Sequence, residues 1–459
     1  MRMNKFRNNI VAALMLVALV SSLAFGQGGP APTQQQQTTK GAVVKGKAPV
    51  NKQVLKVKLP RAEEAKLANG LQVVLLRSTK VPTFNMQMVV LSGGLSDTAD
   101  YRGLARFTAW LLREGTKGRA SKEIAEQVDA LGATLGANSG FSAMTTNVSA
   151  GGLVENFDQT LELFADVIRN PTFPQAEVDR YRNRTLSQLQ LQRSFPQFLA
   201  QEQFNRAIYG TSHPASIVAP PAESLKKLST KDLADFHAKY YRPNNAILAI
   251  VGDLTMKEIM PKLEKAFGSW EKGDVPATTI PAAPAQGEAK IYLIDRPGSV
   301  QTVLQLGTLG IERTNPDYFA VLLADRVLGG GPSGRLFLNL REDKGYTYGA
   351  YSGFGGSKFK GTWTSSSEVR TDVTEGAMKE FMYELNRMRD EKVAAEELEN
   401  AKRAIVGSFA LSLEQPQALL QNIITQKLYN LPVDYWDTYP QKVDAITADD
   451  IQRVAKKYI

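Results

Sequence analysis

The sequence predicts an α+β fold made of two homologous units that share one order of elements. The chain has 459 residues, which is too long for a single hydrophobic core. A stretch rich in Pro, Ala and Thr at 273–288 divides the globular part and is typical of a linker. Similar successions of strand and helix patterns lie on both sides of this stretch, which indicates a structural repeat.

The first unit is expected to span residues 54–272. Its strand patterns alternate or are continuously apolar, and its helix patterns repeat apolar residues every three or four positions. Pro243 ends the helix before the last strand. In chain order we expect strands at 71–78 and 84–94, helices from 103 and at 121–131, a β-like stretch at 132–152, helices around 161–168 and at 175–194, and a strand at 246–251.

The second unit, residues 289–459, repeats this order. Its C-terminal pattern ITADDIQRVAKKYI resembles LSTKDLADFHAKYY of the first unit, but no strand pattern follows it before Ile459. The second sheet is therefore expected to lack a counterpart of the 246–251 strand and to have an edge that is open, covered or paired from elsewhere. We expect strands at 290–295, 301–309, 345–354 and 362–368, and helices at 318–328, from 375 and from 394.

The first 53 residues are predicted to be a signal peptide followed by a disordered leader. Residues 1–26 combine a basic start, an apolar run and small residues at a cleavage site. Residues 27–53 are rich in Gln, Gly, Pro and Thr and poor in aromatic residues. We therefore expect an exported protein, periplasmic or secreted, without a membrane span. Because the chain has no cysteine, its stability must come from core packing and not from disulfides.

The formal net charge of +9 is concentrated near the N-terminus. Arg2, Lys5 and Arg7 belong to the predicted signal peptide, and a run of lysines and one arginine follows before the first acidic residue, Glu63. The rest of the chain is close to neutral. The charge therefore does not indicate a nucleic-acid partner.

Three segments carry a resemblance to a known protein family. They are GLARFTAWLLREGT at 103–116, YYRPNNAILAIVGDL at 240–254 and LADRVLGGGPSGRLFLNLREDKGYTYGAYSGF at 323–354. Together they resemble the insulinase/pitrilysin family of zinc metallopeptidases, from about Leu55 to the C-terminus. The resemblance implies that each unit is an antiparallel-rich sheet with helices packed on one side.

The resemblance also shows that the zinc motif of this family is degenerate here. In the family, the first of these segments carries His-x-x-Glu-His, with two zinc ligands and a general base on one helical face. The matching positions hold Arg106, Ala109 and Trp110. Arginine stays protonated, alanine has no acceptor, and the indole of tryptophan can only donate. The glutamate that serves as third ligand corresponds to Gln188, which is neutral and a poor ligand.

No other zinc site of the usual kind can be built from this chain. It has two histidines, His213 and His237, and no cysteine. The histidines are too far apart in sequence to form an i, i+4 pair on a helix. We expect both to have buried or capping roles, and we expect this chain to hold no metal. Trp110 is interpreted as a structural plug of the vacated metal pocket, and Arg106 either holds a carboxylate there or extends to the surface.

A second set of family residues is retained. The resemblance places an arginine and a tyrosine of the family at Arg341 and Tyr348. In family members this pair binds the substrate main chain and stabilises the tetrahedral intermediate from the side opposite the zinc. A planar cation and a phenolic donor suit a carbonyl oxygen that gains negative charge.

The glycine-rich segment before Arg335 superficially resembles a phosphate-binding loop. No strand directly precedes it in the required order, and no Lys-Ser or Lys-Thr follows its last glycine. We therefore interpret the glycines as positions where the chain turns closely against a neighbouring element.

The resemblance implies that this chain is the non-catalytic, substrate-binding partner of a separate zinc-binding insulinase-family subunit. The partner would hold the zinc, and the two chains would together bind and cut an unfolded peptide; this chain alone would not be a peptidase. The alternative is a catalytically inactive peptide-binding or scaffold protein of the same fold, and the retained Arg341 and Tyr348 favour the first interpretation. A hydrolase with another site is disfavoured, because two histidines form no apparent nucleophile–histidine–carboxylate arrangement.

Overall fold

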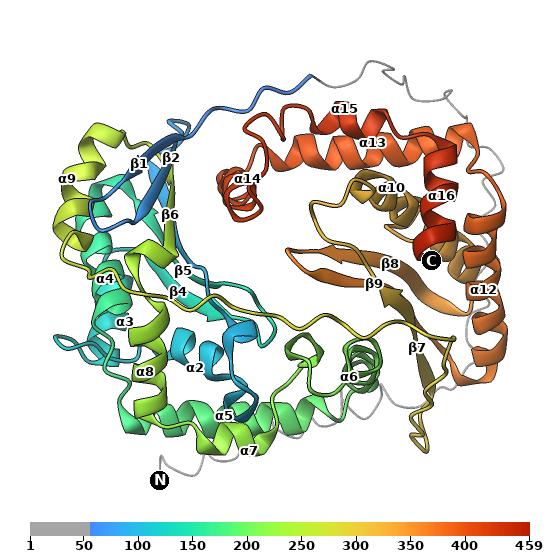
Figure 1. The fold of residues 1–459 in the computed structure, drawn as a ribbon, viewed down its shortest axis with the longest axis horizontal. Coiled ribbons are helices and arrows are strands. Elements are labelled where there is room, and N and C mark those ends of the chain that lie inside the picture. Colours follow the sequence, from blue (N-terminus) through green and yellow to red (C-terminus); the bar gives the residue numbers. More distant parts are fainter. Residues whose placement is uncertain (1–55) are drawn as a thin grey trace, which may run out of the picture. The chain divides into compact units, whose positions relative to one another are not determined.

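The computed structural model describes residues 56–459 (Figure 1). The predicted signal peptide, residues 1–26, and the predicted leader, residues 27–53, lie outside the described part. Within residues 56–459, helices pack against two sheets, one in each half of the chain. None of the helices in this range is long and apolar enough to cross a membrane.

The first half contains a six-stranded sheet with the order β1-β2-β6-β3-β5-β4. Neighbouring strands are antiparallel except β2 and β6, which are parallel. The central strand β6 has the sequence AILAIVG and is buried along its whole length. The strands are β1 (Glu63–Lys66), β2 (Gln72–Arg77), β3 (Thr83–Val90), β4 (Thr134–Ser139), β5 (Thr146–Leu153) and β6 (Ala246–Gly252).

Most helices of the first half contribute to one core on one face of this sheet. In α4 (Phe157–Arg169) the buried residues recur every three or four positions and meet side chains such as Phe84 and Val148 from the strands. The remaining helices of this core are α2 (Leu104–Leu111), α3 (Ser121–Ala130), α5 (Gln175–Gln192), α7 (Ala222–Lys227), α8 (Thr230–Tyr240) and α9 (Met256–Phe267).

The second half contains a three-stranded antiparallel sheet with the order β7-β9-β8. Its strands are β7 (Gln301–Leu309), β8 (Thr347–Gly356) and β9 (Lys360–Arg370). Alternate residues of β9, such as Trp363 and Val369, are buried against helices of the same half. These helices are α10 (Tyr318–Leu328), α12 (Thr374–Asp390), α13 (Ala395–Ser412), α15 (Tyr439–Asp444) and α16 (Ala448–Tyr458).

One helix of each half packs on the sheet of the other half. Helix α14 (Pro416–Leu428) places Leu420 and Ile424 against the second face of the first sheet. Helix α6 (Pro196–Tyr209) packs against β7, where the amide of Gln305 donates to Gln201 at 3.1 Å. Both helices begin with Pro-Gln and have a further glutamine four residues later, so they are counterparts in the repeat. Each sheet is therefore flanked on its second face by a helix from the opposite half.

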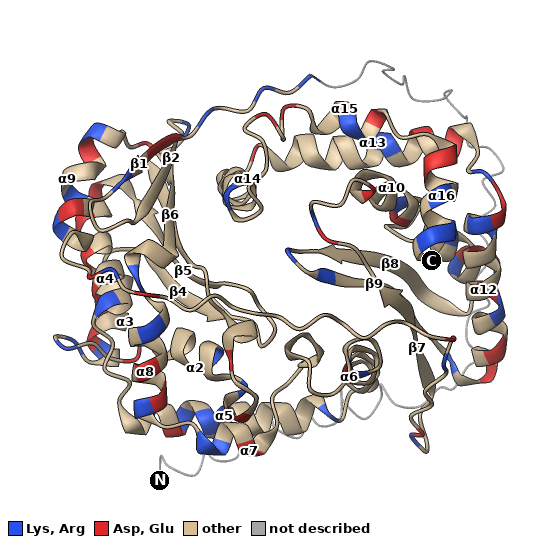
Figure 2. Cartoon of the chain, in the orientation of Figure 1, with Lys and Arg blue, Asp and Glu red and all other residues tan. Residues whose placement is uncertain are grey.

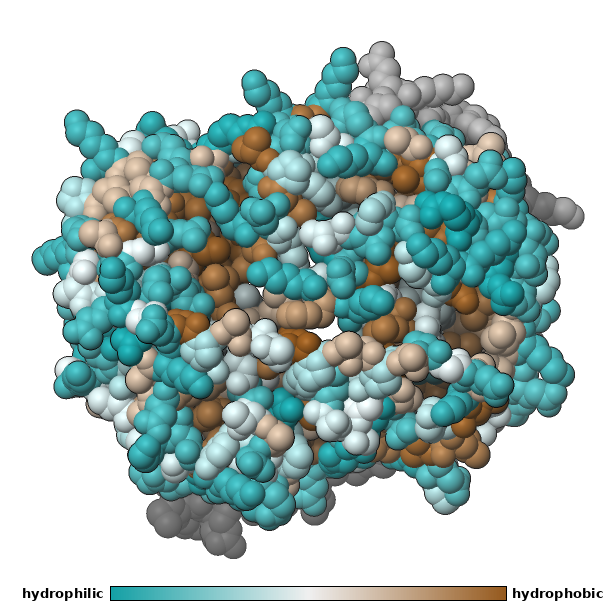
Figure 3. All heavy atoms as spheres, viewed as in Figure 1, coloured by the Kyte–Doolittle hydropathy of each residue, from teal (hydrophilic) through white to brown (hydrophobic). Residues whose placement is uncertain are grey.

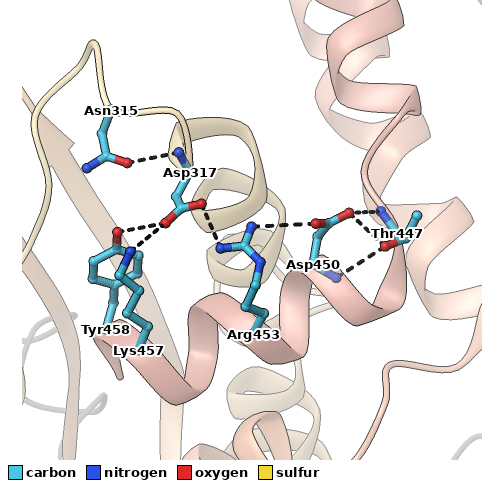
Figure 4. Close-up of polar contacts among 7 residues, drawn as sticks. All are labelled: Asn315, Asp317, Thr447, Asp450, Arg453, Lys457 and Tyr458. Carbon is cyan, nitrogen blue, oxygen red and sulfur yellow. Dashed lines mark hydrogen bonds and ion pairs between the residues drawn. The ribbon is translucent and has the colours of Figure 1, made fainter.

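The C-terminal helix α16 is fixed to the start of α10 by a cluster of polar side chains (Figure 4). The carboxylate of Asp317, just before α10, accepts bonds from Arg453 at 2.7 Å, Lys457 at 3.1 Å and Tyr458 at 2.7 Å. The side chain of Thr447 caps the other end of α16. The last helix is thus tied to the core of the second half by charge and by capping.

The strand expected at 290–295 is not formed. Residues 271–300 contain no helix or strand, and Ile291 and Leu293 are 91% and 89% exposed. The counterpart of this segment in the first half is β2, which pairs with β6. No counterpart of β6 lies in the described second sheet, so the segment has no strand to pair with. The face visible in Figure 3 is mostly hydrophilic, with hydrophobic patches between the polar side chains.

The predicted fold class is confirmed. Each half has a sheet whose strand pairs are mostly antiparallel, and the helices of that half cover one face of it. The other face was not expected to receive a helix from the opposite half, and this exchange creates the site described next.

Candidate functional site

A glycine-rich turn leads from α10 into the segment that carries Arg341 and Tyr348. A Cβ atom at Gly329 would lie 2.5 Å from the backbone nitrogen of Ser352, and one at Gly334 would lie 2.9 Å from the Cα of Gly329. The glycines therefore allow the turn to lie directly against β8, as the sequence indicated. The next residue, Arg335, binds Glu397 of α13 through two bonds of 2.7 Å and fixes the turn to the core.

Arg341 lies in an unusual helical segment. A short helix, α11 (Arg335–Phe337), continues as a π-helix at Leu338–Asp343. Segments of π-helix are rare and frequently occur at functional sites. The guanidinium of Arg341 lies 4.8 Å from the ring centre of Phe337 and 3.6 Å from the carboxylate of Glu342. Nearly half of the Arg341 side chain is exposed, so it is available to a ligand.

Tyr348 lies at the start of the edge strand β8 and is 89% exposed. The pairing of β8 with β9 shifts between Thr347 and Ala350, which is a β-bulge. Hydroxyl groups hold the bulge: Thr347 donates to the carbonyl of Glu368 at 2.7 Å, and Ser367 donates to Thr347 at 3.0 Å. A bulge at an edge re-aims a side chain away from the regular pleat. Its position explains why Tyr348 stands clear of the sheet.

Arg341 and Tyr348 lie on successive elements, the π-helical segment and β8. Phe337 lies between the π-helical segment and β8: its ring is 4.8 Å from the Arg341 guanidinium and 5.6 Å from the ring of Tyr351, three residues after Tyr348. No hydrogen bond or ion pair within residues 56–459 joins the two predicted site residues. Tyr348 lines the pocket described next, whereas Arg341 is not among its lining residues.

A polar pocket of about 500 Å³ lies between α6 and the second sheet, and Tyr348 lines it. In one row across the sheet, Gln305 of β7 is opposite Ser366 of β9, which is opposite Tyr351 of β8. Gln197 and Gln201 of α6 line the other side. This pocket was not predicted from the sequence. The spacing of Gln197 and Gln201 places them on one helical face, but nothing local shows that this face meets the second sheet.

The degenerate zinc motif lies on α2, next to α5. The indole of Trp110 stacks on Tyr181 of α5 with ring centres 4.1 Å apart and planes 7° apart. The guanidinium of Arg184, also on α5, lies 4.2 Å from the centre of the Trp110 indole. Ala109 is fully buried, and Gln188 is exposed one turn beyond Arg184. The aromatic and cationic groups of α5 therefore pack on Trp110, where the family places metal ligands.

Arg106 and the start of α2 have separate contacts. The guanidinium of Arg106 lies 4.7 Å from the ring centre of Phe141. The carboxylate of Asp97 accepts from the backbone amides of Gly103 at 2.7 Å and Ala105 at 2.9 Å, and so caps the helix. Burial raises the pKa of Asp97 to about 7, although these amides and Arg102 act in the opposite direction.

Both histidines have structural contacts, as expected. Nδ1 of His213 accepts from the amide of Ala215 at 3.0 Å and caps a short helical turn. Nε2 of His237 lies 2.7 Å from the carbonyl oxygen of Ile168 and donates to it. Burial lowers the pKa of His237 to about 4 and keeps the ring neutral. No group of three or more His, Cys, Asp or Glu residues able to hold a metal occurs among residues 56–459.

Two family models match successive parts of the chain. The model described as "Insulinase (Peptidase family M16)" matches residues 72–221, and the model described as "Peptidase M16 inactive domain" matches residues 227–405. An uncharacterised zinc protease of Bacillus subtilis is 25% identical over 347 residues, which are 75% of this chain and 83% of the relative.

Two solved structures have the same fold. The "peptidase M16 inactive domain" structure from Pseudomonas fluorescens has a TM-score of 0.80 and 29% identity and covers 87% of this chain and 95% of its own. A protease structure from Helicobacter pylori also has a TM-score of 0.80, with 22% identity, and covers 87% of this chain and 97% of its own. With Arg106, Ala109 and Trp110 at the motif positions, these matches indicate a catalytically inactive protein of this fold.

Proposed function

Because the chain belongs to the insulinase family (peptidase family M16), we propose that it is the non-catalytic, substrate-binding subunit of a heteromeric zinc peptidase. One observation carries the proposal: the motif that would bind zinc is replaced, while Arg341 and Tyr348 are retained and exposed. A scaffold would gain nothing from an exposed phenol on a bulged edge strand beside a polar pocket.

The family implies zinc, but the residues of this chain do not fit it. Arg106 has no lone pair to give, Ala109 has no proton acceptor, and the indole nitrogen of Trp110 only donates. The stack with Tyr181 also occupies the side of α2 that faces α5. No catalytic step is therefore assigned to the first half, and the zinc is proposed to belong to a partner of the same family.

The second half is proposed to bind the peptide. The guanidinium of Arg341 has several donors in one plane and can hold a peptide carbonyl oxygen in the ground state. The hydroxyl of Tyr348 can donate to a carbonyl oxygen of the peptide that gains negative charge. Amide and hydroxyl side chains around the pocket provide further partners for an extended main chain. The proposed substrate is an unfolded peptide.

The proposed place of action is outside the cytoplasm. This rests on residues 1–26, whose basic start and apolar run are typical of a signal peptide. Cell fractionation with N-terminal sequencing of the mature protein tests it. A mature chain that keeps residues 1–26 and stays in the cytoplasm would contradict export.

The test of the function uses the complex of this chain with a zinc-binding family member co-purified from the native envelope. Tyr348→Phe should leave assembly intact and lower kcat about 10²- to 10³-fold, because one donor to a developing oxyanion is lost. Arg341→Ala should also weaken peptide binding. Tyr383→Phe, an exposed tyrosine on α12, is the matched control and should change nothing. Unchanged turnover per folded complex in both site variants would favour the scaffold alternative.

A further inference from the structure

The pocket beside Tyr348 contains one charged side chain. It is lined by residues of α6 and of all three strands of the second sheet, and these are glutamines, hydroxyl residues, two tyrosines, glycine, valine and Glu368. In Figure 2, β8 and β9 are mostly free of charge, whereas helices such as α5, α9 and α12 carry many charged residues. A single carboxylate in an otherwise neutral pocket favours a ligand with a positive charge.

Glu368 reaches this pocket because of the strand register. It lies on β9 opposite Val303 of β7, and the next residue, Val369, points into the core. The backbone carbonyl of Glu368 is bound by Thr347, which fixes the strand beside the bulge. Glu368 is therefore held on the same face of the sheet as Ser366 and Gln305, next to Tyr348.

The carboxylate of Glu368 has no hydrogen bond or ion pair with any residue of the range 56–459, although its side chain is half-buried. The nearest cation along the strand, Arg370, is directed elsewhere: it donates to the carbonyl oxygen of Gly345 at 2.9 Å and lies 3.4 Å from Asp372. A carboxylate that lines a pocket without a protein partner is open to hydrogen bonds from a ligand. A cationic group in the pocket would be attracted to its negative charge.

A metal ion does not suit this position. Divalent cations in proteins take several oxygen ligands, usually with more than one carboxylate. No other acidic residue lines the pocket, and no group of three metal-binding side chains exists in the described part of the chain. An ammonium or guanidinium group needs only one carboxylate, and the surrounding amide and hydroxyl oxygens can accept its remaining protons.

We propose that Glu368 binds a positive charge of the peptide substrate, so that the site selects peptides with a cationic group close to the bond held by Tyr348. This inference rests on the proposed function and adds its specificity. The cation is a lysine or arginine side chain or a free α-amino group. Tyr351 offers an aromatic wall for the aliphatic stem of a long basic side chain.

The experiment measures the dissociation constants of four fluorescent unstructured peptides for the mature chain by anisotropy. The peptides share one sequence with a central lysine or norleucine, and each has a free or an acetylated N-terminus. Wild type should bind the cationic peptides about tenfold more tightly than the neutral ones. If the preference follows the central lysine, the bound cation is a side chain; if it follows the free N-terminus, the bound cation is the α-amino group. Glu368→Gln should abolish the preference without changing the affinity for the neutral peptide.

Two further variants sharpen the test. Glu368→Lys should reverse the preference towards a peptide with glutamate at the central position. Glu375→Gln on α12 removes an exposed carboxylate outside the pocket and should keep the preference. Thermal unfolding of each variant confirms that the protein is folded. High salt should weaken the preference, because a partly exposed ion pair is screened.

The outcomes separate the two proposals. If wild type binds all peptides equally, or if Glu368→Gln keeps the preference for lysine, the role of Glu368 is wrong while peptide binding stands. If wild type binds none of the four peptides, both the proposed specificity and the proposed substrate-binding function are wrong. A preference that is lost only in the Glu368 variants supports the inference.

Discussion

Asp317 provides a quantitative test of how the second half is held together. Its carboxylate is 13% exposed and accepts bonds from Arg453, Lys457 and Tyr458, all on the last helix (Figure 4). Burial by itself would raise the pKa of Asp317, but these three donors hold it at about 2. Asp317→Asn keeps the shape of the side chain and removes its charge.

The size of the effect follows from the pKa. A fall from 3.8 to about 2 is nearly two units, and one unit is about 1.4 kcal/mol, so the ionised form gains about 2–3 kcal/mol in the folded state. The partners Arg453 and Lys457 are about half exposed, which weakens their attraction through solvent screening. We therefore expect Asp317→Asn to lower the free energy of unfolding at pH 7 by about 1–2 kcal/mol.

The stabilisation by ionised Asp317 should depend on pH in a defined direction. A carboxyl group with a depressed folded pKa stabilises the protein above its unfolded value of 3.8, and this stabilisation is lost as the pH falls towards 2. The difference between wild type and Asp317→Asn should be constant from pH 7 to about 5 and should shrink to near zero by about pH 2. Urea unfolding followed by tryptophan fluorescence measures it, because urea does not screen charge.

A matched control separates this cluster from ordinary surface charge. Asp449 also forms an ion pair, with Lys392, but 72% of its side chain is exposed. Asp449→Asn should therefore change the free energy of unfolding by less than about 1 kcal/mol. Equal stability of Asp317→Asn and wild type at pH 7, or a difference that persists unchanged at low pH, would refute the assignment.

Two further predictions concern the first half. Burial lowers the pKa of His237 to about 4, so the unfolded chain takes up the proton first as the pH falls. The free energy of unfolding of wild type relative to His237→Gln should therefore decrease by about 1.4 kcal/mol for each pH unit as the pH is lowered from 6.5 to 4. Urea unfolding at several pH values measures this; Asp97, whose raised pKa acts in the opposite direction, is present in both proteins and cancels. Trp110→Leu should lower the free energy of unfolding by about 1–3 kcal/mol, because it loses an aromatic stack and a cation–π contact. An unchanged denaturation midpoint would show that the stack contributes nothing.

The order of elements could be predicted because it depends on local patterns. The helix expected at 318–328 is α10, with the same bounds, and the continuously apolar run at 246–251 is the buried strand β6. The prediction of a strand at 290–295 was wrong for a non-local reason. Its apolar sequence is suitable, but a strand needs a neighbour, and none lies beside it among residues 56–459.

The candidate site was only partly predictable for the same reason. The resemblance placed Arg341 and Tyr348, but it did not show that a bulge held by Thr347 exposes the tyrosine. The carboxylate of Glu368 has no local signature, since its role depends on the register of β9 with β7. Such features need the folded sheet before they can be seen.

Because helix α6 of the first half packs on the second sheet, the first half contributes to the pocket beside Tyr348. Its motif positions hold Arg106, Ala109 and Trp110, so it supplies no metal chemistry. It still provides one wall of the pocket through Gln197 and Gln201, and the bond from Gln305 to Gln201 ties that wall to the second sheet. Loss of the zinc ligands therefore leaves the first half with a structural task in the proposed peptide site. A stand-alone second half would lack this wall, and its pocket would be open to solvent on the side that α6 covers.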